Sequence, residues 1–368
     1  MAARIKMILC FLYMLVAGFF FVQYSDAAVH TVKDMAGRTL VLPQKVERVV
    51  GLGGALRFLV YLDAVDMVAG VENIEKDPST RYSRPYSLAV EKVAAGLPSI
   101  AEGGPGGRLP NFEKLIELKP DVIFIMGFDK SQADIIQKKT GIPVIFLSYG
   151  DTGLFRKESA FEALRIMGSI INRADRAKKV IDFINQSEND IRKRTEGIKP
   201  KSVYVGAISF KGRHGITSTQ GFYTPFEWLG VKNVVNKTAT HGQVFIDREM
   251  LLVWNPDYIF IDSSGLDMVE DDYRKNSFFY KKLEAVKQGK ILSVMPYNSY
   301  HTNIELMIAN SYFIGKMLYP ERFSDIDPFK KADEIASFFT GLRMLERMQK
   351  NLKVFKKLYF ADNYIEAK

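Results

Sequence analysis

The sequence predicts an α/β protein made of two similar parallel-sheet lobes joined by one long rigid α-helix. Short apolar segments alternate with helical segments from Val49 onward, and this alternation resumes after residue 201. That order of elements is typical of a parallel sheet covered by helices. The residues between the two regions have a helical period and no strand pattern. A short helix-then-strand sequence also occurs once in each region, as expected if one lobe repeats the other.

Residues 1–27 have the features of a secretory signal peptide. Two basic residues precede an apolar run over residues 7–22, and the small residues Ser25 and Ala27 follow at the spacing of a cleavage site. The run is only slightly shorter than a membrane span, so an uncleaved anchor is the alternative. Both interpretations predict an exported protein, and a periplasmic location is expected.

Composition and charge describe an ordinary globular protein long enough for two domains. The chain has 368 residues, of which 47% are hydrophobic and 25% charged, with a net charge of +9. The basic residues are spread along the chain, so no nucleic-acid partner is indicated. The only cysteine, Cys10, lies inside the apolar run. The exported chain is therefore expected to have no disulfide partner and no cysteine to ligate a metal.

The first lobe is expected to occupy residues 28–160. Its strands are apolar without strict alternation, as in sheets covered on both faces. Asn111 is placed to cap a helix and Gly141 to end one. The expected elements are a strand at 48–54 that runs into a glycine turn, a helix at 55–65, a strand at 67–71, a glycine-rich loop at 103–110, a helix at 111–120, a strand at 121–127, a helix at 129–141 and a strand at 142–148.

A connecting helical segment is expected over residues 161–200. Small and apolar residues recur there at helical spacing, and the other faces carry charged side chains. This pattern predicts one long amphipathic helix. The residues that form the apolar face are Ala174, Ala177, Ile181, Ile184 and Ile191.

The second lobe is expected over residues 201–340. Its expected elements are strands at 202–209, 258–262 and 291–294 and helices at 222–229, 248–253 and 301–318. Residues 341–368 predict a basic amphipathic helix, with seven Lys or Arg and three Asp or Glu. This helix either packs back on the protein with a solvated basic side, or contacts an anionic membrane surface or another protein.

The repeated sequences are "NFEKLIELKPDVIF" at 111–124 and "DREMLLVWNPDYIF" at 247–260. With a constant offset, Glu113 aligns with Glu249, and each sequence has Pro-Asp before an apolar strand. Matching apolar residues alone would be weak evidence for a repeat. The shared Glu, Pro and Asp at one register favour a duplicated unit.

The order of several motifs over residues 30–325 resembles the periplasmic solute-binding proteins of ABC importers, in the group whose lobes are joined by one rigid helix. The motifs are "VHTVKDMAGRTLVLPQKVERVVGLGG", the two repeated sequences, and "GKILSVMPYNSYHTNIELMIANSYFIGKMLYP". That group takes up ferric siderophores, haem, cobalamin and related metal compounds. "GGPGG" and "YNSYHTN" are similar to a branch that includes receptors for metals and for molybdate and tungstate.

The resemblance implies a partner and a role for the repeated glutamates. In the family, one surface glutamate on each lobe docks onto arginines of the permease dimer, and the matching positions are Glu113 and Glu249. An exposed carboxylate can form a bidentate pair with arginine. The alternative is that both are first-turn glutamates favoured by the helix dipole.

Two such lobes would leave a ligand cleft at the carboxyl ends of their strands. Aromatic, basic and amide side chains that follow the predicted strands are the candidates for contacting a ligand there. His301 either ligates a metal directly or caps the helix that follows. The candidate residues are Arg57, Arg84, Tyr86, Arg108 and Phe128 in the first lobe, and Phe210, Arg213, Tyr297, Tyr300 and His301 in the second.

The expected function is that of an extracytoplasmic receptor without catalysis or cofactor. It would capture an iron(III) chelate, a siderophore or a related metal compound and deliver it to the permease. A molybdate or tungstate receptor is the alternative on the same fold. A ligand-sensing envelope domain or a secreted α/β enzyme would also be compatible with the predicted lobes. No GxSxG occurs, which argues against a nucleophile-elbow hydrolase.

Overall fold

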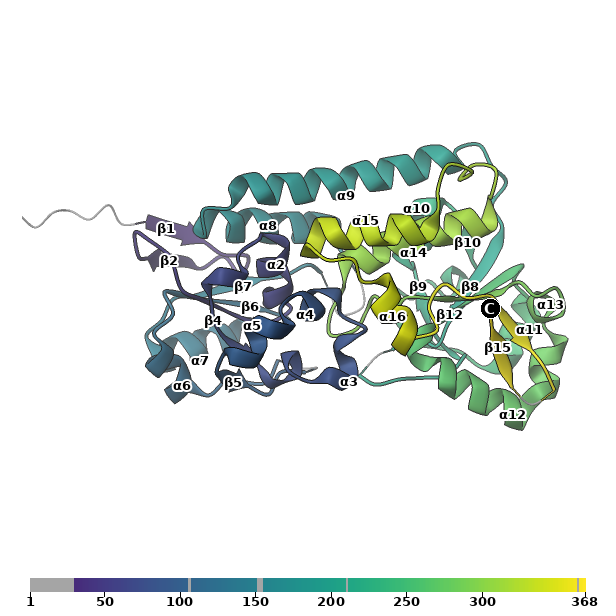
Figure 1. The fold of residues 1–368 in the computed structure, drawn as a ribbon, viewed down its shortest axis with the longest axis horizontal. Helices are drawn as coiled ribbons and strands as arrows, with labels where there is room; N and C mark the ends of the chain where they lie inside the picture. The colour runs from purple at the N-terminus through teal and green to yellow at the C-terminus, as the bar shows by residue number, and fades with distance from the viewer. Residues whose placement is uncertain (1–29, 105–106, 151–154, 210, 363) are drawn as a thin grey trace, which may run out of the picture.

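The computed structural model describes residues 30–104, 107–150, 155–209, 211–362 and 364–368. It is an α/β protein with two lobes, and the long helix α9 (Ala174–Thr195) runs along the top of both (Figure 1). Within these ranges no helix is both long and apolar enough to cross a membrane. The predicted signal peptide lies outside the described residues.

The first lobe is built on a five-stranded parallel sheet in the order β5-β4-β3-β6-β7. Most residues of its strands are buried on both faces, which is why they lack alternation. The strands are β3 (Val49–Gly53), β4 (Val68–Glu72), β5 (Ser99–Ala101), β6 (Val122–Met126) and β7 (Val144–Leu147), and a hairpin of β1 (His30–Lys33) and β2 (Thr39–Leu42) precedes them. The helices are α2 (Ala55–Tyr61), α3 (Pro78–Arg81), α4 (Pro85–Ala89), α5 (Glu91–Gly96), α6 (Phe112–Leu118) and α7 (Lys130–Thr140).

The second lobe has a four-stranded parallel sheet in the order β10-β8-β12-β13. Its strands are β8 (Ser202–Gly206), β10 (Lys232–Asn233), β12 (Tyr258–Asp262) and β13 (Ile291–Val294), beside an antiparallel pair of β9 (Ser218–Gly221) and β11 (Gly242–Phe245). The helices are α10 (Thr224–Leu229), α11 (Arg248–Trp254), α12 (Leu266–Lys282), α13 (Glu284–Lys287) and α14 (Ile304–Leu318). Helix α14 packs against α9 and α10.

The connecting segment is two helices rather than the single helix predicted over 161–200. Helix α8 (Lys157–Ile170) ends before Asn172, whose φ of +54° breaks the helical path, and α9 begins at Ala174. Asparagine tolerates this left-handed conformation better than most residues. The backbone N–H of Arg173 donates to the carbonyl of Gly168 at 2.7 Å, so the chain turns tightly. Within this segment, α9 is the helix that runs along both lobes (Figure 1).

The predicted basic amphipathic helix at 341–368 is wrong for most of its length. Helix α15 (Pro328–Thr340) leads into the short α16 (Leu345–Asn351), and the chain ends in a hairpin of β14 (Leu358–Phe360) and β15 (Ile365–Ala367). The backbone before the hairpin pairs with β13, where Ser293 N donates to Lys356 O at 2.8 Å and Phe355 N donates to Ser293 O at 3.1 Å. Phe355 stacks on Phe313 with ring centroids 4.1 Å apart. The segment therefore packs back on the second lobe, and Arg347 of α16 also pairs with Glu91 of the first lobe at 2.8 Å.

The shared aspartates of the repeated sequences form equivalent hydrogen bonds in the two lobes. Asp121 Oδ2 accepts the backbone N–H groups of Glu47 and Arg48, each at 2.8 Å, just before β3. Asp257 Oδ2 accepts the N–H and the hydroxyl of Ser202, each at 2.9 Å, at the start of β8. Each carboxylate thus ties the strand it precedes to the neighbouring central strand.

Candidate ligand-binding site

A cavity of about 280 Å³ lies at the carboxyl ends of β6 and β7. The strand order of the first sheet reverses between β3 and β6, and ligands of open α/β sheets bind beside such a reversal. First-lobe backbone and aromatic groups form most of the wall, and one side chain comes from the segment that follows β13. The lining residues are Met126, Gly127, Phe128, Phe146, Leu147, Ser148, Tyr149, Gly150 and His301.

His301 enters the cavity from the second lobe and touches first-lobe backbone. A Cβ on Gly127 would lie 2.2 Å from Cε1 of His301, so only glycine leaves room for the ring. The ring also meets Tyr149 edge-on, with centroids 5.6 Å apart. Burial, and to a lesser extent the charge of Arg57, lowers the pKa of His301 to about 3. The imidazole is therefore neutral at pH 7 and offers one N–H donor and one nitrogen lone pair.

The alternative role of His301 as a helix cap does not hold. The N-cap position of α14 belongs to Asn303. Asn303 instead uses its side-chain amide to donate to the carbonyls of Tyr297 at 3.1 Å and Ser299 at 2.9 Å. His301 itself has a left-handed φ of +70° and directs its ring into the cavity wall.

Tyr300, which precedes His301, also contacts the first lobe. Its hydroxyl donates to Glu72 Oε2 at 2.7 Å, and the same oxygen accepts the N–H of Gly53 at 2.9 Å. Burial raises the pKa of Glu72 to about 8, although the hydrogen bond from Tyr300 opposes this shift. Glu72 is at the end of β4 and is 1% exposed, so it supports the site from within the first lobe.

Arg57 does not line the cavity. Its side chain is fully buried, and its guanidinium donates to the carbonyl of Tyr300 at 2.5 Å and to Oδ1 of Asn303 at 3.1 Å. The guanidinium also lies 4.4 Å above the ring of Tyr86. Arg57 therefore holds the segment before α14 rather than lining the cavity.

Arg84 and Tyr86 are likewise turned into the first lobe. Both converge on Glu75: Arg84 Nη1 lies 3.2 Å from one carboxylate oxygen, and the hydroxyl of Tyr86 donates to the other at 2.8 Å. All three side chains are fully buried. A buried ion pair of this kind fixes the α3–α4 region.

The remaining predicted contacts fall in different places. Phe128 lines the cavity. Tyr297 is 2% exposed and accepts a 3.1 Å hydrogen bond from Gln220 of β9. Arg108 and Arg213 are exposed, and Arg213 pairs with Asp267 at 2.6 Å. Phe210 lies outside the described residues.

Sequence reasoning missed three wall residues and the supporting residue Glu72. Ser148, Tyr149 and Gly150 follow β7 as Phe128 follows β6, so the rule that sites form at carboxyl ends of strands would have found them. Glu72 ends β4 and was missed because a lone acidic residue at a strand end gives no specific signal.

The described residues that line the cavity do not form a metal cage. Across the described ranges no three His, Cys, Asp or Glu side chains are grouped to hold a metal ion. His301 contributes one nitrogen, and the donors around it are neutral hydroxyl and backbone groups. The geometry suits a ligand that brings its own coordination shell or is itself an oxyanion.

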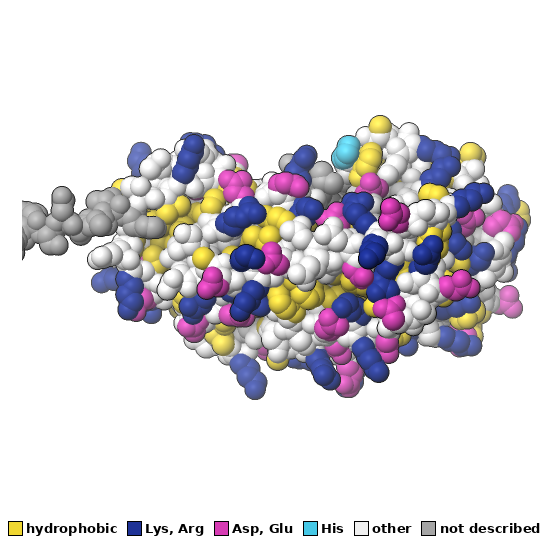
Figure 2. All heavy atoms as spheres, turned by 90° about the horizontal axis from the view of Figure 1, so that it is seen from above, with side chains coloured by type: hydrophobic (Ala, Val, Ile, Leu, Met, Phe, Trp, Pro, Cys, Tyr) yellow, Lys and Arg dark blue, Asp and Glu magenta, His cyan; other side chains and the backbone are white. Residues whose placement is uncertain are grey.

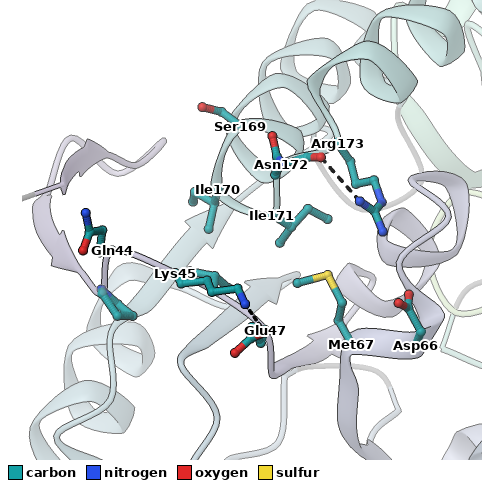
Figure 3. Close-up of a pocket in the computed structure, with 12 residues that line it drawn as sticks. Gln44, Lys45, Glu47, Asp66, Met67, Ser169, Ile170, Ile171, Asn172 and Arg173 are labelled. Atoms are coloured by element: carbon teal, nitrogen blue, oxygen red, sulfur yellow. Dashed lines mark hydrogen bonds and ion pairs between the residues drawn. The ribbon is translucent and has the colours of Figure 1, made fainter.

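A larger cavity of about 720 Å³ lies elsewhere, at the amino ends of β3 and β4 (Figure 3). Ile170 and Ile171 line it together with Met67, and the rim carries the ion pair of Lys45 and Glu47 at 2.6 Å. Because the amino ends of parallel strands are not where such sheets bind ligands, this cavity is not the candidate site.

Glu113 and Glu249 occupy equivalent positions in α6 and α11. Both are exposed first-turn residues of seven-residue helices. Figure 1 shows α9 along the top and both short helices below it, one in each lobe. Four positions before each glutamate stands an exposed apolar residue, Leu109 at 43% and Phe245 at 57%. Each lobe thus presents an exposed carboxylate with an exposed apolar side chain four positions before it.

The surface seen from the α9 side has no large patch of one charge (Figure 2). Figure 2 shows basic and acidic side chains interspersed over this face. A nucleic-acid partner would require a continuous basic stripe, and this face does not provide one.

Comparisons with known proteins agree with the geometry. The family described as "Periplasmic binding protein" matches residues 53–297. The molybdate-binding protein MolA of Haemophilus influenzae is 23% identical over 85% of this chain and 91% of its own length. The petrobactin-binding protein YclQ of Bacillus subtilis is 29% identical over 68% of this chain and 75% of its own length.

Solved structures share the fold. MolA of Haemophilus influenzae bound to molybdate superimposes with a TM-score of 0.67 at 18% identity, covering 85% of this chain and 98% of that one. The TroA-like periplasmic binding protein FepB of Veillonella parvula gives a TM-score of 0.64 at 19% identity, covering 92% and 99%. The two-lobed arrangement is therefore that of these proteins.

Proposed function

The chain belongs to the periplasmic binding protein family, and from this membership we propose that it is the extracytoplasmic receptor of an ABC importer. The observation that carries the proposal is the cavity at the carboxyl ends of β6 and β7, whose wall includes His301 from the other lobe. A ligand seated there would contact both lobes at once. Family members are solute-binding proteins rather than enzymes, and the proposal includes no catalysis and no cofactor.

The proposed ligand is an iron(III) chelate, a siderophore or a related metal compound. A neutral imidazole and aromatic side chains suit such a complex, because they donate hydrogen bonds or a lone pair without competing for the metal as a full cage would. Relatives with siderophores in their names support this choice: the petrobactin-binding protein and the ferric-anguibactin-binding protein FatB of Vibrio anguillarum.

Molybdate or tungstate is the second candidate. The likeness to the molybdate-binding protein covers 85% of the chain. Backbone N–H groups at the turns after β6 and β7, together with the N–H of His301, would serve an oxyanion, since such groups bind anions without a charged side chain.

The proposed partner is the permease dimer of the importer, and the proposed location is the periplasm. Glu113 and Glu249 would each meet one half of a two-fold partner, because the structure repeats the same exposed carboxylate on equivalent helices. Complementary charge at such contacts fixes register and speeds encounter. Leu109 and Phe245 would add an apolar contact beside each carboxylate.

A panel of thermal melts tests the proposed function. The exported chain is melted with ferric siderophores, haem, corrinoids, molybdate and tungstate at increasing concentration. A true ligand stabilises the folded protein by about RT ln(1 + [L]/Kd), so the melting temperature rises with ligand concentration. His301→Ala should abolish the shift. No shift with any compound, or hydrolysis of one, would contradict the receptor assignment.

A further inference from the structure

Residues 297–303 lie between β13 and α14 and form hydrogen bonds to both lobes. We call these residues the strap. On the second-lobe side, both polar ends of the Gln220 amide hold the strap. Its nitrogen donates to the hydroxyl of Tyr297 at 3.1 Å, and its oxygen accepts from the amide of Asn298 at 2.9 Å. Gln220 is fully buried in β9, so this end of the strap is fixed to the second lobe.

The middle of the strap is fixed to the first lobe. The hydroxyl of Tyr300 donates to Glu72 at 2.7 Å, and the carbonyl of Tyr300 accepts from Arg57 at 2.5 Å. The hydroxyls of Ser83 and Ser299 share a 2.6 Å hydrogen bond. The strap is thus bonded to both lobes within a few residues.

The backbone of the strap is strained where His301 enters the cavity. Tyr300 and His301 have consecutive positive φ angles of +45° and +70°. A non-glycine residue in this region costs about 1–3 kcal/mol and persists only where surrounding contacts enforce it. Asn303 holds the segment from within by donating to the carbonyl of Ser299 at 2.9 Å. The contacts of Tyr300 are those that tie the strained pair to the first lobe.

We propose that Tyr300 is a positioning residue whose hydrogen bond to Glu72 holds the strap in its strained conformation and thereby places the imidazole of His301 in the cavity. Tyr300 does not line the cavity and acts on a ligand through its neighbour. The inference takes the cavity as the ligand site of the proposed function, but its test needs no ligand.

The test measures how accessible His301 is to diethyl pyrocarbonate. Peptide mass mapping follows the modification of His301 and of the exposed His241. The readout is the modification rate of His301 divided by that of His241. Tyr300→Phe removes one oxygen and keeps the ring. It should raise the ratio by about fivefold to tenfold, the range set by losing a hydrogen bond to a buried carboxyl. Glu72→Leu should do the same, whereas Glu72→Gln keeps an acceptor oxygen and should behave as the unaltered protein.

Tyr312→Phe is the matched control. Its hydroxyl also donates to a carboxylate, Asp190 Oδ2 at 2.9 Å, but it joins α14 to α9 away from the strap. Tyr312→Phe should lose similar stability and leave the modification ratio unchanged. If Tyr300→Phe and Glu72→Leu give the same ratio as Tyr312→Phe, Tyr300 has no positioning role. If the ratio changes as expected while no compound shifts the melting temperature, the receptor assignment falls and the positioning role stands.

Discussion

Tyr300 and Glu72 are 228 positions apart in the chain, and yet the hydroxyl of one donates to the carboxyl of the other at 2.7 Å inside the protein. The carboxyl has a pKa raised to about 8 from an ordinary value of 4.5, chiefly because it is buried. Protonation and folding are therefore linked at this residue.

The first prediction is a pH dependence of stability that originates at Glu72. Between pH 4.5 and about 8 the folded protein keeps a proton that the unfolded chain has released, so the free energy of unfolding should fall as pH rises through this window. Glu72→Gln cannot titrate and should flatten that part of the profile. Urea unfolding of both proteins at pH 5, 7 and 9 measures it. Parallel profiles for the two proteins would contradict the prediction.

The second prediction concerns Gly127. Gly127→Ala should be destabilising for two reasons, a φ of +83° and a methyl group 2.2 Å from the His301 ring. Gly141→Ala is the matched control, because it has a φ of +71° with nothing within 4 Å of the added methyl. The control should cost about 1–2 kcal/mol, the cost of a left-handed conformation for a residue with a Cβ. Gly127→Ala should cost more and should also displace His301, weakening ligand binding at least tenfold, measured by calorimetry. Equal behaviour of the two variants would show that the ring is not held there.

The third prediction concerns the buried pair of Arg84 and Glu75. Glu75→Gln leaves a guanidinium without its counter-charge in a site with no exposure, and loss of one partner of such a pair costs about 3–5 kcal/mol. Adding Arg84→Met should recover part of the loss. A double-mutant cycle from denaturant unfolding measures the coupling. A coupling near zero would mean that each side chain is independent of its partner's charge.

The fourth prediction separates docking from binding. Glu113→Arg/Glu249→Arg should leave ligand affinity unchanged and reduce uptake in cells at least tenfold, because both contacts with a two-fold permease would become repulsive. Glu196→Arg/Glu321→Arg makes the same charge change at two separate exposed glutamates and should transport normally. Normal uptake by the first variant would remove the docking proposal.

Much of the fold was predictable because it depends on local signals. The strand at β6 is fully buried and reads as an unbroken apolar run. Asn111 caps α6 by accepting from Lys114 N, and Gly141 ends α7 in a left-handed conformation, as predicted. These features need only neighbours in the sequence.

The predictions that differed depended on contacts between distant residues. Arg57 follows a glycine turn and was expected to contact a ligand, but its guanidinium donates to Asn303, 246 positions further along the chain. The apolar spacing of residues 341–368 fits a helix, but Ser293 and its neighbours pair with this backbone instead. No local pattern reports such pairings, because tertiary hydrogen bonds override propensity.

The last residues of the chain have a consequence for solubility. Strand β13 is the outer strand of its sheet, and Leu292 forms a bridge with Lys357 while the hairpin of β14 and β15 lies beside it. An uncovered outer strand would present free backbone donors and acceptors on which another copy could add a strand. The carboxyl-terminal segment covers this edge. We therefore expect a chain cut at residue 351 to form insoluble aggregates even where its two lobes still fold.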